Sequence, residues 1–186
     1  MTSMELSRKA YIADFVVYTL LVAGLGLWLA ASAPWLPSLG LLLLGALSWS
    51  LLEYLLHRWV LHELPPFCNW HADHHRRPGA LIAAPTWLSA GLLGIATLPA
   101  WWWLQAWQAG ALSLGLSAAY LGYGVAHHLA HHPWRGPSLP GVNLAGFRRR
   151  HALHHRGSAG LSPEPCNYGV STGAWDWFFQ SAPRRR

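Results

Sequence analysis

Two long stretches without a formally charged residue constrain the fold of this chain more than any other feature. No Asp, Glu, Lys or Arg occurs in residues 15–52 or in residues 78–134. A helix needs roughly 20 apolar residues to cross a bilayer, so each stretch is long enough for two crossings. The composition agrees, because 53% of the residues are hydrophobic and only 11% are charged, which is too little charge for an ordinary soluble domain. We therefore expect an integral membrane protein.

Turn signals divide each uncharged stretch near its middle. The first is interrupted at residues 33–37, where two prolines lie three residues apart, and the second at residues 107–110, which end in glycine. We predict four membrane-spanning helices in two hairpins, at residues 11–32, 36–56, 84–107 and 111–125. The 186 residues are expected to form a single membrane-embedded domain with short tails at residues 1–10 and 180–186.

The basic residues predict how the helices are oriented. With four spans, the N-terminus, the central segment and the C-terminal tail lie on one side, and all thirteen Lys and Arg residues fall there. By the positive-inside rule this side is cytoplasmic. Because all basic residues except Lys9 are arginine, as in GC-rich genomes, we expect a bacterial inner-membrane protein. The net charge of +6 comes without an aromatic–basic nucleic-acid motif, so no nucleic-acid partner is expected.

A cleaved signal peptide is an alternative to the first predicted span. A cleaved signal peptide would use the pair Arg8-Lys9, the apolar run after it and the small residues at 31–33. The length of the run and Pro34 directly after that site favour a retained span.

Cys68 and Cys166 are far apart and lack metal-type spacing, so we expect two reduced thiols.

Histidine clustering is the strongest functional signal. The twelve histidines form four clusters: His57 and His62; His71, His74 and His75; His127, His128, His131 and His132; and His151, His154 and His155. Residues three or four apart share a helix face, so an HxxHH motif presents three imidazoles from one turn. Such spacings suit one metal or two adjacent metals, and imidazole binds Fe, Zn, Cu and Ni. In the predicted topology all four clusters lie on the cytoplasmic side.

The order of these motifs resembles the fatty acid hydroxylase/sterol desaturase superfamily. That order is HxxxxH, HxxHH, HxxxH and HxxHH. Glu53-Tyr54 before the first motif and the closing run NYGVSTGAWDWFF at residues 167–179 resemble its fatty acid 2-hydroxylase branch. The resemblance covers about residues 49–179 and implies an all-α integral membrane protein. In such a protein about four transmembrane helices in two hairpins carry a cytoplasmic, His-rich helical cap that holds two metals.

The resemblance also implies the ligands and the chemistry. The implied metal ligands are His57, His62, His71, His74, His75, His127, His131, His151, His154 and His155. In the third motif the resemblance selects His127 and His131, and the pair His128 and His132 is the alternative. Ten ligands give five to each metal, which leaves an octahedral ion one open position for oxygen. The implied cofactors are two non-haem iron ions, with zinc as an alternative metal, and O2 is the co-substrate.

The implied activity is hydroxylation of a lipid C–H bond by O2 and external electrons. The substrate classes left open are fatty acyl, sphingolipid-type, sterol-like and carotenoid lipids. Because the sequence shows no fused cytochrome domain, we expect a separate electron donor, either a cytochrome b5-like protein or a ferredoxin with its reductase. The sequence leaves the oligomeric state open.

Three polar residues are candidates for assisting the metal ligands. Glu53 lies one helical turn before His57, and we predict that it orients a ligating ring, the alternative being an ion pair with an arginine. Asp176 and Asn167 lie in the closing run and are expected either to contact ligands or to cap helices. Asp73 is expected to be solvated. The arginines at residues 148–150 and 184–186 are expected to set topology and contact lipid headgroups, with docking of an acidic electron donor as the alternative.

Other classes of protein also use histidine-rich sequences. A lipid desaturase has similar histidine motifs, but the closing run at 167–179 favours a hydroxylase. A metal transporter would place ligands within its spans, and a bis-histidine haem carrier needs one histidine on each of two facing spans. The predicted spans 11–32 and 84–107 contain no histidine, which disfavours both.

Overall fold

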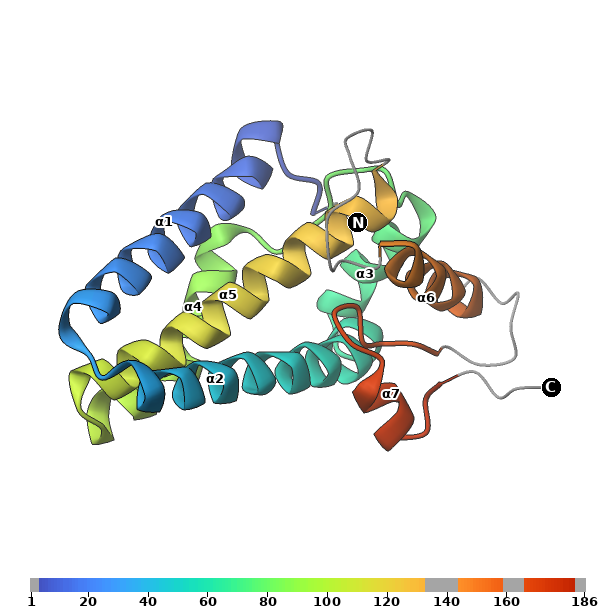
Figure 1. Ribbon diagram of the computed structural model, residues 1–186. Coiled ribbons are helices and arrows are strands. Elements are labelled where there is room, and N and C mark those ends of the chain that lie inside the picture. Colours follow the sequence, from blue (N-terminus) through green and yellow to red (C-terminus); the bar gives the residue numbers. More distant parts are fainter. Residues whose placement is uncertain (1–3, 133–143, 159–165, 183–186) are drawn as a thin grey trace. The chain divides into compact units, whose positions relative to one another are not determined.

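All regular structure in the described part of the chain is helical (Figure 1). The computed structural model describes residues 4–132, 144–158 and 166–182. The elements are α1 (Arg8–Ser32), α2 (Trp35–Leu55), the π-helical turn η1 (Leu56–Leu61), α3 (Phe67–Arg76), α4 (Thr86–Trp103), α5 (Ala106–His131), α6 (Leu144–Ser158) and α7 (Ala174–Phe178). The chain divides into two compact units. The apolar unit contains Met4–Trp49 and Ala83–Gly122, and the histidine unit contains Ser50–Ile82 and Tyr123–Arg186.

Three of the described helices are long and apolar enough to cross a membrane. They are Arg8–Ser32, Trp35–Leu61 (α2 with η1) and Ala106–His131. Helix α4 occupies the third segment for which a span was predicted, but it is not one of the three; it contains Pro99, and its last three residues are tryptophans. Tryptophan prefers the membrane interface to the hydrocarbon core. The all-helical class is therefore confirmed with three candidate spans, and the four-span topology stays a prediction.

The second interhelical turn lies earlier than predicted. Helix α4 ends at Trp103 and α5 begins at Ala106. The side-chain Oε1 of Gln108 accepts a hydrogen bond of 3.0 Å from the backbone N–H of Gln105, which satisfies a donor at the start of α5. Gly110 is part of α5, and a Cβ at this position would lie 2.3 Å from the Trp28 ring. Packing, rather than a turn, requires this glycine.

Two glycines bring the backbones of α2 and α5 into direct contact within the apolar unit. A Cβ at Gly45 would lie 2.2 Å from the carbonyl oxygen of Leu112, and a Cβ at Gly115 would lie 1.9 Å from that of Leu42. Both distances are far below van der Waals contact. Small residues at such positions let membrane helices approach closely and gain packing energy.

Replacing Gly45 by alanine is expected to destabilise the protein by about 1–3 kcal/mol, since the backbone of α5 must move to admit the methyl group. Gly40 is the matched control on the same helix, because a Cβ there meets nothing within 4 Å. Gly40→Ala should leave stability unchanged or raise it slightly through helix propensity. Thermal unfolding in detergent measures both variants, and equal midpoints would contradict the close α2–α5 contact.

A polar cluster ties three helices of the apolar unit together. The Asp14 carboxylate of α1 accepts hydrogen bonds from the Tyr120 hydroxyl (2.6 Å) and the Ser89 hydroxyl (2.9 Å). The Tyr18 hydroxyl donates to Ser89 at 3.1 Å. A carboxylate within an apolar helix requires such partners. Asp14 therefore links α1 to α4 and α5.

Candidate metal centre

Nine histidines of the histidine unit form two groups in which one ring nitrogen per residue lies within 4.8 Å of the others. Group A contains His57, His62, His71, His75 and His154, and group B contains His74, His131, His151 and His155. The groups are adjacent, because the rings of His75 (group A) and His155 (group B) have centroids 4.2 Å apart. Adjacent sets of four and five imidazoles can hold two neighbouring metal ions.

Each HxxHH motif serves both groups. His71 and His75 of α3 join group A while His74 joins group B; His151 and His155 of α6 join group B while His154 joins group A. In an α-helix, residue i+4 is rotated by about 40° around the helix axis from residue i, whereas residue i+3 is rotated by about 60° in the opposite direction. The two outer histidines of a motif therefore point to one group and the middle one to the other.

The π-helical turn η1 explains how the first histidine pair converges. His57 and His62 are five residues apart, which in an α-helix would rotate them by about 140° relative to each other. The wider turn of a π-helix brings the fifth residue back toward the same side, and π-helical turns are frequent at functional sites. Here the two ring centroids lie 5.3 Å apart.

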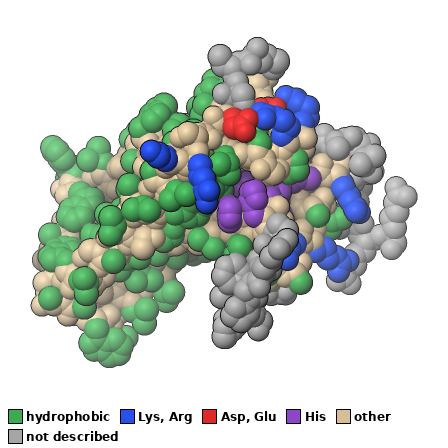
Figure 2. Space-filling model, turned by 90° about the horizontal axis from the view of Figure 1, so that it is seen from above, with side chains coloured by type: hydrophobic (Ala, Val, Ile, Leu, Met, Phe, Trp, Pro, Cys, Tyr) green, Lys and Arg blue, Asp and Glu red, His purple; other side chains and the backbone are tan. Residues whose placement is uncertain are grey.

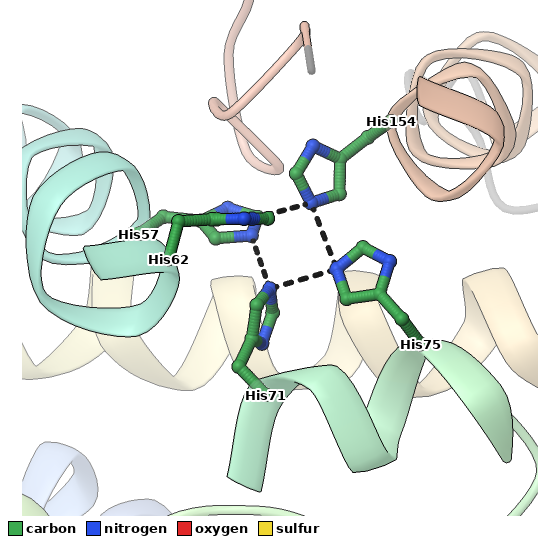
Figure 3. Close-up of side chains that lie close together, drawn as sticks. All are labelled: His57, His62, His71, His75 and His154. Atoms are coloured by element: carbon green, nitrogen blue, oxygen red, sulfur yellow. Dashed lines mark hydrogen bonds between the residues drawn. The ribbon is translucent and has the colours of Figure 1, made fainter. Parts of the chain in front are cut away.

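Backbone carbonyls fix the tautomers of two group A rings. The Nδ1–H of His57 donates to the carbonyl of Tyr168 at 2.5 Å, and the Nδ1–H of His154 donates to that of Cys166 at 2.9 Å. Because a carbonyl only accepts, each Nδ1 carries the proton and each Nε2 presents a lone pair. The Nε2 of His154 lies 3.2 Å from the Nε2 atoms of both His62 and His75 (Figure 3).

The spacing of these nitrogens fits metal coordination. Two imidazoles bound about 2.1 Å from one ion at a right angle place their nitrogens about 3.0 Å apart. In group A the Nε2 of His71 lies 3.0 Å from that of His57 and 2.9 Å from that of His75. In group B the Nε2 of His151 lies 2.7 Å from that of His131 and 3.0 Å from that of His155.

An unpartnered buried ring supports the same fit. Within the described residues, neither ring nitrogen of His74 has a hydrogen-bond partner although both are buried. Buried polar atoms normally have partners, and a missing ion is one reason for an exception. The imidazole nitrogens present in the two groups therefore fit two metal ions.

Burial keeps the rings in the form that binds metals. It lowers the pKa of His62 and His155 to about 4, of His74 and His154 to about 3 and of His75 to about 2. Burial also holds the pKa of His71 and His151 well below the usual value, and the neighbouring imidazoles lower it further. These rings are therefore neutral at pH 7, which leaves a lone pair for a metal.

Of the ten predicted ligands, only His127 lies outside the two groups. Its ring nonetheless contacts group B, with centroids 4.8 Å from His74, 5.0 Å from His131 and 4.8 Å from His151. His128 and His132 stack on each other with centroids 4.4 Å apart and belong to neither group. The structure thus places His131, with His127 beside it, toward the cluster.

Glu53 and Asp176 bind a backbone segment that we call the strap (residues 166–171). One Glu53 oxygen accepts from the N–H groups of Val170 (2.6 Å) and Ser171 (3.0 Å), and the other accepts from the Ser171 hydroxyl. Asp176 accepts from the N–H groups of Tyr168 and Gly169, both at 2.8 Å. Glu53 thus acts on backbone amides, whereas the sequence predicted a contact with an imidazole. Burial raises the pKa of Asp176, and hydrogen bonds from Ser181 and the strap oppose this.

The strap carbonyls are the functional atoms that sequence reasoning missed, because any residue supplies a carbonyl. Asn167 contributes through its backbone: its φ of 56° is in the left-handed region that asparagine tolerates, and its N–H donates to the Ser181 carbonyl at 3.1 Å. The nearby Gly169 could have indicated a closely packed backbone here, because a Cβ at this position would lie 2.0 Å from the Thr172 carbonyl oxygen.

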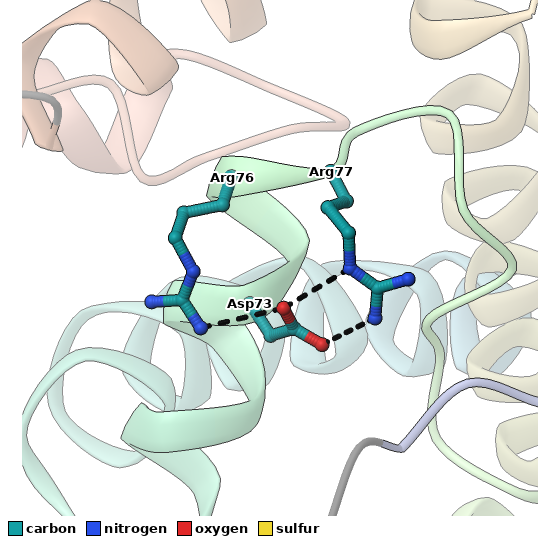
Figure 4. A network of polar contacts seen from close by, with 3 residues as sticks. All are labelled: Asp73, Arg76 and Arg77. Atoms are coloured by element: carbon teal, nitrogen blue, oxygen red, sulfur yellow. Dashed lines mark hydrogen bonds and ion pairs between the residues drawn. The ribbon is translucent and has the colours of Figure 1, made fainter.

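The remaining charged residues near the site mostly bind the protein itself. Asp73 of α3 pairs with Arg76 (3.3 Å) and with Arg77 (2.6 Å), which follows the helix, instead of being only solvated (Figure 4). Arg148 donates to the Leu129 carbonyl at 2.9 Å, and Arg150 to that of Val170 at 3.4 Å. The predicted basic tail at residues 184–186 lies outside the described residues. Both cysteines are free, as expected.

The amino-acid sequence matches the family model for fatty acid hydroxylase over residues 42–181. The chain belongs to the fatty acid hydroxylase family. Among its relatives, human fatty acid 2-hydroxylase is 28% identical over 153 residues, covering 76% of this chain and 39% of that protein. Dihydroceramide fatty acyl 2-hydroxylase of Arabidopsis thaliana is 28% identical over 162 residues, covering 79% of this chain and 62% of that protein.

Two further proteins extend this likeness. Beta-carotene hydroxylase of Paracoccus sp. (strain PC1) is 29% identical over 114 residues, covering 56% of this chain and 66% of that protein. The hydroxylase domain in a structure of full-length scs7p shares the fold, with a TM-score of 0.75 at 22% identity over 97% of this chain and 68% of that one. This fatty acid hydroxylase family member spans only 39% of the length of the human relative.

Part of the histidine cluster reaches the surface. Figure 2 shows histidine side chains exposed on one face of the molecule. His62, His71 and His75 are half-buried, whereas His57 and His154 are buried. Three of the five group A histidines are therefore partly exposed.

Proposed function

We propose that this family member is a di-metal oxygenase that hydroxylates a lipid with O2 and electrons from a separate donor protein. The observation that carries the proposal is the pair of adjacent imidazole groups, A and B, in one compact unit. The names of the relatives support a lipid substrate, since they specify fatty acids, a dihydroceramide fatty acyl chain and beta-carotene. All three are largely apolar molecules that reside in membranes.

Iron is the proposed metal in both groups, with His127 as a fifth ligand beside the four of group B. Imidazole accepts several metals, so the ligand type alone does not select iron. Hydroxylation by O2 needs electrons that zinc cannot supply because zinc has no redox chemistry. When bound, an iron pair would supply the electrons that reduce O2, and the protein would supply binding and orientation.

The chain's own residues would contribute neutral ligands and fixed geometry. Imidazoles that stay neutral at pH 7 bind the ions without adding negative charge, unlike the glutamate-rich soluble di-iron bundles. The carbonyls of the strap keep the Nε2 atoms of His57 and His154 as the lone-pair atoms. The three candidate spans would give an apolar substrate access from the bilayer.

Cytoplasmic termini remain part of the proposal, on the basis of the basic residues. Arg8 and Lys9 are the first residues of the first candidate span, and residues 184–186 are arginines. A reporter enzyme that works only in the cytoplasm, fused after Arg186, should be active. Activity of a reporter that works only outside the cytoplasm would reverse the orientation.

Lipid analysis of the native host tests the function. The total lipids of cells with the intact protein are compared by mass spectrometry with those of cells carrying His155→Ala. A precursor lacking one oxygen atom is expected to accumulate in the variant, which would also reveal the substrate class. Loss of a double bond instead would indicate a desaturase, and unchanged lipids under conditions where the intact protein makes its product would contradict catalysis at this site.

A further inference from the structure

A single peptide group connects Asp176 to a predicted metal ligand. The carbonyl of Tyr168 accepts from His57 Nδ1–H at 2.5 Å. The N–H of the same peptide group, which belongs to Gly169, donates to Asp176 Oδ2 at 2.8 Å. The peptide is conjugated, so a carboxylate at its N–H increases the negative charge on its carbonyl oxygen. That oxygen then holds the imidazole N–H more strongly.

The other end of the strap is attached to the helix that bears His57. Glu53 lies four residues before His57 and binds the Val170 and Ser171 amides. Asp176 is 1% exposed and Glu53 4% exposed, so neither carboxylate can exchange its partners for water without opening the segment. Charged acceptors roughly double the strength of such hydrogen bonds. The strap therefore has both its position and its polarity set by two buried carboxylates.

The histidine rings that contact the strap tyrosine in the described structure all belong to group A, and its ring also lies 6.2 Å from that of Tyr54. The Tyr168 ring lies 5.8 Å from His57, 5.3 Å from His62 and 5.5 Å from His154 between centroids. The two imidazoles that donate to strap carbonyls, His57 and His154, also belong to group A. The strap thus acts on one group and not equally on both.

We propose that Asp176 and Glu53 are positioning residues for the group A metal, acting through the strap peptides on His57 and His154, so that the two metal positions differ in what holds them. This inference rests on the proposed two-metal centre. Group B would depend on its helices α3, α5 and α6. Neutralising either carboxylate should then weaken metal binding in group A and leave group B unchanged.

Chelator titration of the purified, iron-loaded, full-length protein tests this asymmetry. Removing the partners that orient a ligating histidine typically lowers metal affinity by about 10- to 100-fold. For Asp176→Asn, one of the two metal equivalents should be released at a chelator concentration roughly 10- to 100-fold lower than in the unsubstituted protein. The second metal equivalent should be released at the same chelator concentration as in the unsubstituted protein. Glu53→Gln should give the same pattern without altering the amide contacts of Asp176.

Asp73→Asn is the matched control, since it also neutralises a carboxylate near the histidines, but one whose ion pairs are with Arg76 and Arg77 at the end of α3 and not with the strap. It should leave both equivalents unchanged. Combining Asp176→Asn with His155→Ala should leave only the weakly held equivalent. A parallel shift of both equivalents in Asp176→Asn and Glu53→Gln, or no shift in either, would overturn the inference. An unsubstituted protein that binds fewer than two metals would instead contradict the proposed function.

Discussion

The His131→Ala variant is expected to lose lipid hydroxylation by more than about 100-fold and to retain only one of two metal equivalents. Loss of groups that merely support a ligand already costs about 10- to 100-fold, and His131 supplies a ring nitrogen to group B directly. Product formation by liquid chromatography and mass spectrometry, together with elemental analysis, measures both effects.

His132→Ala is the matched control, one residue further along the chain. His132 stacks on His128 outside both groups, so this variant should keep its metal and most of its activity. The two variants together decide whether the metal is bound by His127 and His131 or by His128 and His132. Loss of metal in His132→Ala with retention in His131→Ala would reverse the assignment.

Removing the metal is expected to abolish activity, and only a redox-active ion should restore it. After chelation, Fe(II) should return both the metal content and the activity, because neutral imidazoles bind it and it can transfer electrons. Zinc should refill the same positions without restoring turnover.

Two controls make this exchange decisive. Zinc content measured on the reconstituted protein shows that the positions are filled, and a second treatment with Fe(II) after zinc removal shows that the protein has survived. Full activity with zinc would contradict a redox mechanism. Activity that survives complete metal removal would place the chemistry outside groups A and B.

The helices were predictable because their cause is local in the sequence. Uncharged stretches of this length have few alternatives to helices in a membrane, and α1 and α2 lie within three residues of the predicted boundaries. The turn before α5 was misplaced because Gly110 resembles a turn residue. Its true reason, the Trp28 ring of a distant helix, is not visible in the local sequence.

The site was predictable in composition but not in arrangement. Spacing shows which histidines share a helix face, yet it does not show that His71 and His75 face one group while His74 faces the other. The π-helical turn that brings His57 and His62 together depends on hydrogen bonding that no residue type specifies. Likewise, Glu53 was expected at an imidazole, and its actual partners are backbone amides.

Oxygen-isotope labelling tests whether the protein is an oxygenase. The purified protein is incubated with iron, a reducing system and membrane lipids under ¹⁸O2 in ordinary water. The molecular mass of the product is then measured by mass spectrometry. Hydroxylation uses one oxygen atom for the new C–OH group and reduces the other to water with two external electrons and two protons. We expect the product to carry one ¹⁸O atom. A product that takes its oxygen from water, or a lipid that loses hydrogen without gaining oxygen, would show that the protein does not hydroxylate lipids with O2.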